Sequence, residues 1–510
     1  MRKPLLFLLV PFYLCSQPRP APKSPKLIVA IVIDQFRYDY LTRFQDGYTG
    51  GLKQMLDNGA DFTNAFLEHI PTVTAVGHST FLSGATPALS GIIANEWWDR
   101  EFHKRVTSVS DDSTQLLGAS GTGSSPARLL QSTLGDELKM SGKGGKVIGI
   151  SIKDRSAILP AGHMADGAYW FDGKTGNFVS STHYFKELPA WAADFNASRP
   201  ADKYAGKNWM SYTAPTKADA TLYGSLDATP WGNELIEQFA RRALEAEHMG
   251  KGDHIDLLAV SFSSNDYVGH KVGPDAPEVR DMAIRVDKLI GELIAAAETG
   301  AGAGNVLVVL TADHGVAPVP EVNQARKMPG GRVNAASERQ AIERGLASRF
   351  GEGTWVDDMS DAGVYLNRQT ILAHKLTEAA VEEAAAESLR ALPYVFRVAT
   401  RDDLRHGAIS ADQVGVRMRN GFNEARSGDV IVILNPYWMP GASGTTHGAP
   451  FSYDAHVPLI FWGWGVRAGR YDRNVAPNDV APTLATMLNV ETPSGSVGRV
   501  LEEMLQPTAK

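Results

Sequence analysis

The chain has 510 residues, of which 43% are hydrophobic and 21% charged, a composition typical of globular rather than disordered proteins. Its 50 Lys and Arg residues are outnumbered by 57 Asp and Glu residues, and the resulting net charge of −7 argues against a general nucleic-acid-binding protein. The single cysteine, Cys15, excludes a disulfide framework, a cysteine-based zinc finger and an iron–sulfur protein.

The N-terminal segment, residues 1–25, is predicted to be a signal peptide followed by a polar tether. A basic start precedes an apolar run that ends near Cys15, and this run is shorter than the ~20 apolar residues that span a bilayer. We therefore expect export to the periplasm or the medium. A lipid anchor at Cys15 is the less favoured alternative, because bulky residues precede the cysteine. No later stretch is long and apolar enough to be a transmembrane span.

Continuous apolar runs alternate with helical patterns along the chain. Runs of this kind fit strands that are buried on both faces of a mostly parallel sheet, and alternation with helices indicates an α/β fold. The predicted strands cover residues 26–34, 146–152, 254–262 and 305–312. The predicted helices cover residues 48–58, 77–84, 126–141, 232–248 and 276–297, and Ser125-Pro126 resembles the start of the third.

Two regions interrupt this alternation and are predicted to be insertions in one catalytic domain of residues 26–510. Residues 156–230 are rich in Trp, Tyr, Pro and Gly and are expected to cover the site. Residues 320–440 are expected to form a second module, with strands at 363–366, 395–398 and 430–434 and a helix near 372–391. The run at 457–462 is expected to return to the central sheet.

Aspartates and histidines gather where the predicted strands end. Ligands bind outside the carboxyl ends of strands in open α/β sheets, so polar residues at these ends define one candidate site. Asp266 and His270 are four residues apart and share a helical face. The full set is a mixed oxygen and nitrogen set that suits zinc better than calcium or magnesium. It consists of Asp34, Asp266, His270, Asp313, His314 and His447.

Each of these residues alone has a more ordinary explanation. An aspartate after a strand is often a helix cap or a turn former, and a single histidine is more often structural than a metal ligand. Only their joint occurrence at strand ends indicates a site. His456 is expected to be structural or to support a ligand, and His78 to serve packing or capping.

Thr74 is the candidate nucleophile, because the segment 71–84 runs from a turn into a helix. The positive end of a helix dipole and its free N–H groups favour an alkoxide and an anionic substrate. A threonine needs activation by a base or a metal, and zinc could supply it. The alternative is that Thr72 or Thr74 is only an N-cap residue.

Asn95, Lys153 and Arg155 are the candidate phosphate-binding residues. The Asn95 amide can donate a hydrogen bond to a phosphoryl oxygen. Lys153 and Arg155 alternate in a segment expected to be extended, so both cations would face one point. The alternatives are a turn asparagine and a solvated charged loop.

Together these motifs resemble the alkaline phosphatase superfamily, and within it the monomeric bacterial alkaline phosphatases with a threonine nucleophile, which are related to nucleotide pyrophosphatase/phosphodiesterases. The resemblance covers roughly residues 26–320 and 427–500. It includes Asp34, the Pro-Thr-x-Thr segment at 71–74, Gly91-Ile-Ile-Ala-Asn95, Lys153-Asp-Arg155, Asp266 to His270, Asp313-His314-Gly315 and His447-Gly448.

The resemblance implies two zinc ions and a phosphothreonine intermediate. One zinc site would consist of Asp34, Thr74, Asp313 and His314, and the other of Asp266, His270 and His447. The Lys153/Arg155 pair resembles the pair found in the branch of the superfamily that hydrolyses small phosphate monoesters. The resemblance also implies a monomer. A phosphodiesterase or nucleotide pyrophosphatase of the same superfamily is the alternative, and a non-catalytic zinc protein is a more distant one.

Overall fold

The computed structural model describes residues 24–506. The predicted signal segment, including Cys15 and its possible acylation, falls almost entirely outside these residues. Among the described helices, none is both long enough and apolar enough to cross a membrane.

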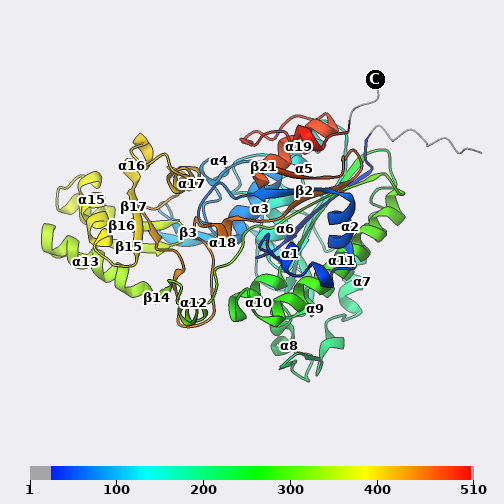
Figure 1. The fold of residues 1–510 in the computed structure, drawn as a ribbon, viewed down its shortest axis with the longest axis horizontal. Helices are drawn as coiled ribbons and strands as arrows, with labels where there is room; N and C mark the ends of the chain where they lie inside the picture. Colours follow the sequence, from blue (N-terminus) through cyan, green and yellow to red (C-terminus); the bar gives the residue numbers. More distant parts are fainter. Residues whose placement is uncertain (1–23, 507–510) are drawn as a thin grey trace, which may run out of the picture.

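The central sheet of the described chain lies in the right-hand part of the molecule in Figure 1. It has eleven strands and is mostly parallel around its middle. The four strands predicted from apolar runs lie side by side in the order β13-β1-β12-β7, all parallel. The expected α/β fold with a mostly parallel sheet is therefore confirmed. These strands are β1 (Leu27–Ile33), β7 (Gly144–Ser151), β12 (Ile255–Phe262) and β13 (Val306–Thr311).

Outer strands extend this sheet on both sides. Beyond β13, the strand β20 pairs antiparallel with it, so the run at 457–462 does return to the central sheet. Beyond β7, β8 is parallel and β9 antiparallel. The outer strands are β2 (Ala60–Ala65), β5 (Ser110–Leu117), β6 (Thr122–Ser124), β8 (Gly167–Asp172), β9 (Asn177–Ser181), β20 (Leu459–Gly463) and β21 (Gly469–Val475).

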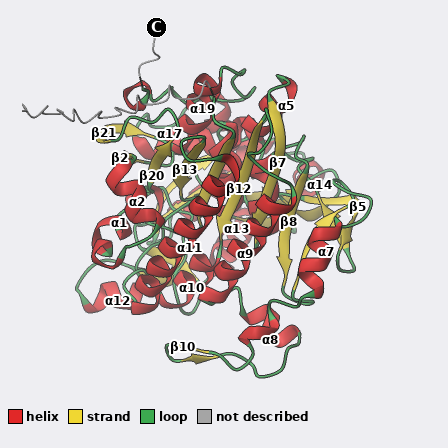
Figure 2. Cartoon of the chain, turned by 90° about the vertical axis from the view of Figure 1, so that its right-hand side faces the viewer, coloured by secondary structure: helices red, strands yellow, loops and turns green. Residues whose placement is uncertain are grey.

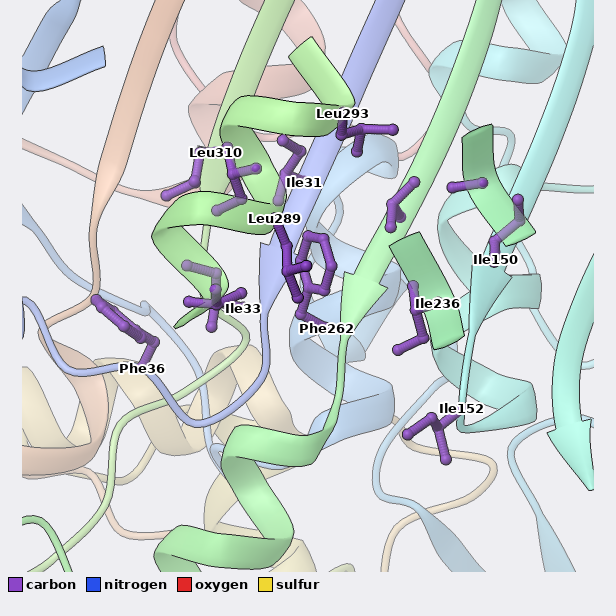
Figure 3. Close-up of a cluster of buried hydrophobic side chains, with 14 of the residues drawn as sticks. Ile31, Ile33, Phe36, Ile150, Ile152, Ile236, Phe262, Leu289, Leu293 and Leu310 are labelled. Carbon is purple, nitrogen blue, oxygen red and sulfur yellow. The ribbon is translucent and has the colours of Figure 1, made fainter. Parts of the chain in front are cut away.

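Helices cover both faces of the sheet, because alternate side chains of each buried strand point to opposite faces. In β1, Ile31 and Ile33 pack toward α9 and α11, whereas Ile28 and Val32 pack toward the opposite helices. Figure 3 shows side chains of the cluster that contains Ile31 and Ile33, and Figure 2 shows α9 and α11 lying across the strands. The flanking helices are α2 (Gly51–Asn58), α9 (Pro230–Ala246) and α11 (Pro277–Ala301) on one face, with α3 (Thr74–Ser83), α5 (Leu134–Met140) and α19 (Val480–Leu488) on the other.

The predicted helix at 126–141 begins later than expected. Thr133 is the N-cap of α5, and its side chain and that of Asp136 satisfy each other's backbone N–H groups in a capping box. Ser125 instead donates a hydrogen bond from Oγ to Asp111 Oδ2 at 2.6 Å. A true capping box thus sets the helix start eight residues after the Ser-Pro signal.

Part of the predicted insertion at 156–230 belongs to the central sheet instead. The strands β8 and β9 lie within this range, and β8 is buried along five of its six residues. Phe178 on β9 stacks on Phe239 of α9, with ring centroids 4.0 Å apart. The aromatic residues of this region therefore fill the core between these strands and α9, and the rest of the predicted insertion follows β9.

Residues 320–440 contain a second sheet with its own core, seen at the left of Figure 1. Its strand order is β15-β16-β18-β17, and Trp355, Val381 and Leu389 are buried against it. The helix expected near 372–391 is divided into two, because Thr377 caps a new helix start. The elements are α12 (Pro320–Ala325), β14 (Gly331–Val333), α13 (Ala335–Phe350), β15 (Val356–Ser360), β16 (Gly363–Leu366), α14 (Arg368–Ala373), α15 (Glu378–Arg390), β17 (Val395–Thr400), α16 (Arg401–His406), α17 (Gln413–Gly421), β18 (Val430–Leu434) and β19 (Trp438–Pro440).

Candidate active site

The carboxyl ends of the four central strands bring the predicted polar residues together. Asp34 follows β1 and Asp313 follows β13, and these strands are neighbours. Strand β12 leads into α10 (Ser264–Val272), which carries Asp266, and β7 leads into α6 (Asp154–Ala161) through Lys153. His447 lies in the loop that follows β19, where the chain returns from the second module to the central sheet.

The six predicted Asp and His ligands lie in one cluster with two overlapping groups. In the first, His314 Nε2 lies 3.5 Å from Asp34 Oδ1 and 3.4 Å from Asp313 Oδ2. The second contains Asp266, His314 and His447, with ligand atoms within 4.8 Å of one another. His270 Nε2 lies 3.1 Å from Asp266 Oδ1. His314 therefore borders both groups, whereas the family resemblance places it in the first.

Backbone carbonyls orient all three histidine rings. Nδ1 lies within hydrogen-bonding distance of Thr445 O in His270 (2.8 Å), of Thr72 O in His447 (2.7 Å) and of Gly315 O in His314 (3.0 Å). A carbonyl oxygen can only accept, so Nδ1 carries the proton in each ring. Nε2 then carries the free lone pair and faces the carboxylates, which is the usual orientation of a metal-binding histidine.

Three atoms at the centre of the cluster test whether a metal would fit. Asp34 Oδ1, Asp313 Oδ2 and His314 Nε2 are buried and lack a satisfied hydrogen bond within residues 24–506. His78 Nδ1, 3.2 Å from Asp313 Oδ2, already donates to Thr74 O at 2.8 Å. Leaving such atoms unpaired costs about 1–3 kcal/mol each, and more for charged groups. A divalent cation among them would satisfy all three, and this oxygen and nitrogen donor set fits zinc.

Burial and crowding of like charges shift the pKa values of these groups. Burial raises the pKa of Asp34 well above its usual value, and the neighbouring Asp313 carboxylate raises it further. Burial opposes ionisation of Asp266 too, but Lys153 and His270 hold its pKa well below the usual value. Burial lowers the pKa of His314 to about 3, so its ring is neutral and able to bind a metal.

Lys153 lies inside the cluster, and its segment is not extended as predicted. Its ammonium nitrogen is 2.7 Å from Asp34 Oδ2, 2.6 Å from Asp266 Oδ2 and 3.4 Å from Thr74 Oγ1. Lys153 is the N-cap residue of α6 and Arg155 lies in the first turn of that helix, so helical geometry replaces the expected alternation. Arg155 Nη1 is 3.9 Å from Asp154 Oδ1, and Arg155 Nε is buried without a partner among the described residues.

Thr74 is the first residue of α3 and is 1% exposed. The N-cap of this helix is Val73, so neither threonine acts as the cap. Thr72 Oγ1 instead donates to Ala449 O and accepts from Gly448 N, and thereby fixes the loop that carries His447.

Asn95 is fixed at the entrance to the same helix. Its Oδ1 accepts a hydrogen bond from Ala75 N at 2.8 Å. This contact orients the amide, and its Nδ2 can donate to an anion that lies against Thr74. The structure thus brings Thr74, Asn95 and Lys153 to one end of the cluster.

Two residues of the site were not recognised in the sequence. Gln35 donates from Nε2 to Asp266 Oδ1 at 2.7 Å, and its backbone N–H donates to Asp313 Oδ1 at 3.1 Å. His78 Nδ1 lies 3.2 Å from Asp313 Oδ2, so its role extends beyond packing or capping. The i,i+4 spacing from Thr74 was the available signal for His78, whereas Gln35 had none apart from its place after Asp34.

His456 lies away from the cluster. Its ring stacks between Tyr38 and Phe66, with centroids 4.5 and 4.4 Å away, and its Nε2 donates to Thr63 O. These contacts give it a structural role.

Residues 28–452 match the family described as type I phosphodiesterase / nucleotide pyrophosphatase. A Myroides odoratus protein named calcium-transporting ATPase is 37% identical over 95% of this chain and 95% of its own length. The Synechococcus elongatus alkaline phosphatase PhoV is 36% identical over 94% of this chain and 93% of its own. The Elizabethkingia meningoseptica alkaline phosphatase PafA is 34% identical over 98% of each chain.

The fold is also similar to a solved structure over nearly its whole length. The crystal structure of wild-type PafA superposes with a TM-score of 0.89 and 35% identity, covering 96% of this chain and 100% of that chain. Sequence and structure agree, and the chain belongs to the type I phosphodiesterase / nucleotide pyrophosphatase family of the alkaline phosphatase superfamily.

Proposed function

We propose that the protein is a metal-dependent alkaline phosphatase that hydrolyses small phosphate monoesters. The observation that carries the proposal is the position of Thr74, a buried hydroxyl at a helix N-terminus beside two adjoining groups of Asp and His ligands. The full-length similarity to PhoV and PafA, both named alkaline phosphatases, supports it.

We propose two zinc ions as cofactors. Asp34, Thr74, Asp313 and His314 would hold one, and Asp266, His270 and His447 the other. The unpartnered buried atoms Asp34 Oδ1, Asp313 Oδ2 and His314 Nε2 support a cation at the first position. When bound, such ions lower the pKa of a hydroxyl and stabilise negative charge on phosphoryl oxygens.

Thr74 supplies the attacking oxygen. A bond forms from Thr74 Oγ1 to phosphorus while the bond to the ester oxygen breaks, and the alcohol leaves with the proton that Thr74 gives up. Water then cleaves the phosphothreonine, releases inorganic phosphate and restores the hydroxyl. The N-terminus of α3 favours the negative charge that develops at Thr74.

Asn95, Lys153 and Arg155 bind the oxygens that do not react. A monoester carries one more negative charge than a diester, so two cations at this position favour monoesters. This pair distinguishes our proposal from the second candidate, a phosphodiesterase or nucleotide pyrophosphatase, which the matched family favours by its name.

We also propose that residues 1–25 direct export to the periplasm or the medium, and that residues 26–510 act as a monomeric catalytic domain. The basic and apolar start of the chain supports export. The second sheet, with its separate core, supports treating 320–440 as an inserted module.

The decisive experiment couples metal analysis to hydrolysis of an aryl phosphate and of a bis-aryl phosphate. We expect two zinc ions per chain and a strong preference for the monoester, with activity lost on chelation and restored by zinc. A preference for the diester would favour the second candidate. Activity that survives complete removal of metal would contradict both.

A further inference from the structure

A cavity of about 470 Å³ opens from the metal-ligand cluster toward the second module. His270, His447 and Asn95 line its inner end, and the strands β16 and β18 form its far wall. Thr74 belongs to the first ligand group, and in an in-line displacement at a two-metal site the second ion stabilises the leaving oxygen. In the proposed reaction the leaving alcohol would therefore depart on the side of His270 and His447. The cavity is therefore the space into which the leaving group extends, and we call it the leaving-group cavity.

Three carboxyl side chains line the leaving-group cavity. They are Glu338, Asp361 and Asp454. The described residues that line the cavity include two histidines but no Lys or Arg. Asp454 forms part of the base, where Oδ2 accepts from Ala449 N and Oδ1 is buried without a partner. The other two carboxylates come from the second module.

Neither module carboxylate is neutralised by an ion pair within residues 24–506. Asp361 lies in the turn between β15 and β16, and the nearby Arg105 is already held by Asp358 through three hydrogen bonds and by Glu96. Glu338 is half-buried in the first turn of α13, and burial raises its pKa. Burial raises the pKa of Asp361 as well, and a cation in the cavity would stabilise the ionised form of both carboxyl groups.

The remaining walls are apolar and aromatic. Val364, Ile431 and Ile433 come from the module sheet, and Trp438 and Tyr453 add aromatic surface. Aromatic rings together with carboxyl groups that have no ion-pair partner suit a cation that has an apolar body, such as an alkylammonium group. The volume lies within the range of about 300–1,000 Å³ that is common for small-molecule sites.

We propose that the leaving-group cavity selects phosphate monoesters of cationic alcohols, such as amino alcohols and their quaternary ammonium derivatives. This inference rests on the proposed phosphatase function and adds a substrate class to it. Substrate would bind with its phosphate at Thr74 and Lys153 and its cation between Asp361 and Glu338. Leaving groups that carry a carboxylate or a further phosphate would be repelled.

The test compares phosphocholine with 3,3-dimethylbutyl phosphate, its uncharged isostere, in which carbon replaces nitrogen. We expect kcat/KM to be about tenfold higher for phosphocholine in the wild-type enzyme, from cation–π and charge contributions. Asp361→Asn and Glu338→Gln should each reduce this ratio about threefold, without lowering kcat/KM for the isostere. Glu352→Gln, an exposed residue of the module that does not line the cavity, is the matched control.

Direct binding separates failure of this inference from failure of the proposed function. Benzyltrimethylammonium should bind to the zinc-loaded protein in calorimetry, and the double variant Asp361→Asn/Glu338→Gln should bind it at least about fivefold more weakly. Equal kcat/KM for the two esters, or binding that the double variant leaves unchanged, would overturn the inference. Absence of any monoester hydrolysis would contradict the proposed function, and the binding measurement would still decide on the cavity.

Discussion

The rings of His314 and His447 stack with their centroids 3.5 Å apart and their planes 14° from parallel. His314 follows a central strand, whereas His447 belongs to the loop that returns from the second module. Thr72 bonds that loop at Gly448 and Ala449. The two ligand groups are therefore in direct contact through these rings. The segment that leads into α3 holds the loop of His447 in place beside His314.

Replacing Thr74 with alanine should abolish turnover. The variant loses the proposed nucleophile, so the rate of aryl phosphate hydrolysis should fall about 10³-fold or more. Zinc content should stay mostly intact, because the aspartate and histidine ligands remain. Steady-state kinetics and metal analysis of the same preparation check both parts. Full activity of Thr74→Ala would refute the assignment.

Replacing both Lys153 and Arg155 with alanine should impair monoester hydrolysis far more than diester hydrolysis. Loss of preorganised cations should cost about 10²-fold or more on the dianionic monoester, because its extra charge is no longer compensated. The ratio of kcat/KM for an aryl phosphate and a bis-aryl phosphate measures the effect. Lys174→Ala, in an exposed turn, is the control. Equal losses on both substrates would contradict the assignment of these cations.

The central strands could be predicted because burial on both faces leaves a continuous apolar run in the sequence. The strands β8 and β9, which extend the sheet beyond β7, were missed for the opposite reason. Their residues 167–172 and 177–181 include Gly, Asp, Asn and Ser among aromatic side chains, and aromatic packing against α9 is a tertiary effect that no local period records.

The gathering of the candidate ligands in one cluster could be predicted because parallel strands end at the same edge of a sheet. The supporting residues could not. Gln35 bonds to Asp266, which lies 231 residues away in the sequence. The backbone of Gln35 has a φ of 53°, a conformation that residues other than glycine rarely adopt. Its role depends on that turn and on the register of β1 with β12, which the sequence alone does not fix.

Gln35→Ala should weaken zinc binding while leaving all predicted ligands in place. The amide of Gln35 donates to Asp266 Oδ1 and orients this carboxylate, and loss of such a partner typically lowers metal affinity about 10- to 100-fold. Competition with a zinc chelator measures the change, and Gln340→Ala on the exposed face of α13 is the control. Unchanged zinc affinity would show that the hydrogen bond does not position Asp266.

Glu382 should make the protein less stable as pH rises toward neutrality. Burial raises its pKa from 4.5 to about 7 in the folded protein, so the folded state holds a proton that the unfolded chain has released. The stabilising contribution is complete below pH 4.5 and is lost as pH rises through about 7.

Glu382→Gln stays neutral and keeps an oxygen that can accept from Asp402 N. Its unfolding temperature should therefore exceed that of the wild type by about 2 °C or more at pH 8, and by much less at pH 5. The exposed neighbour Glu383→Gln should produce no such pH-dependent difference, and an equal response of both variants would refute the role of burial.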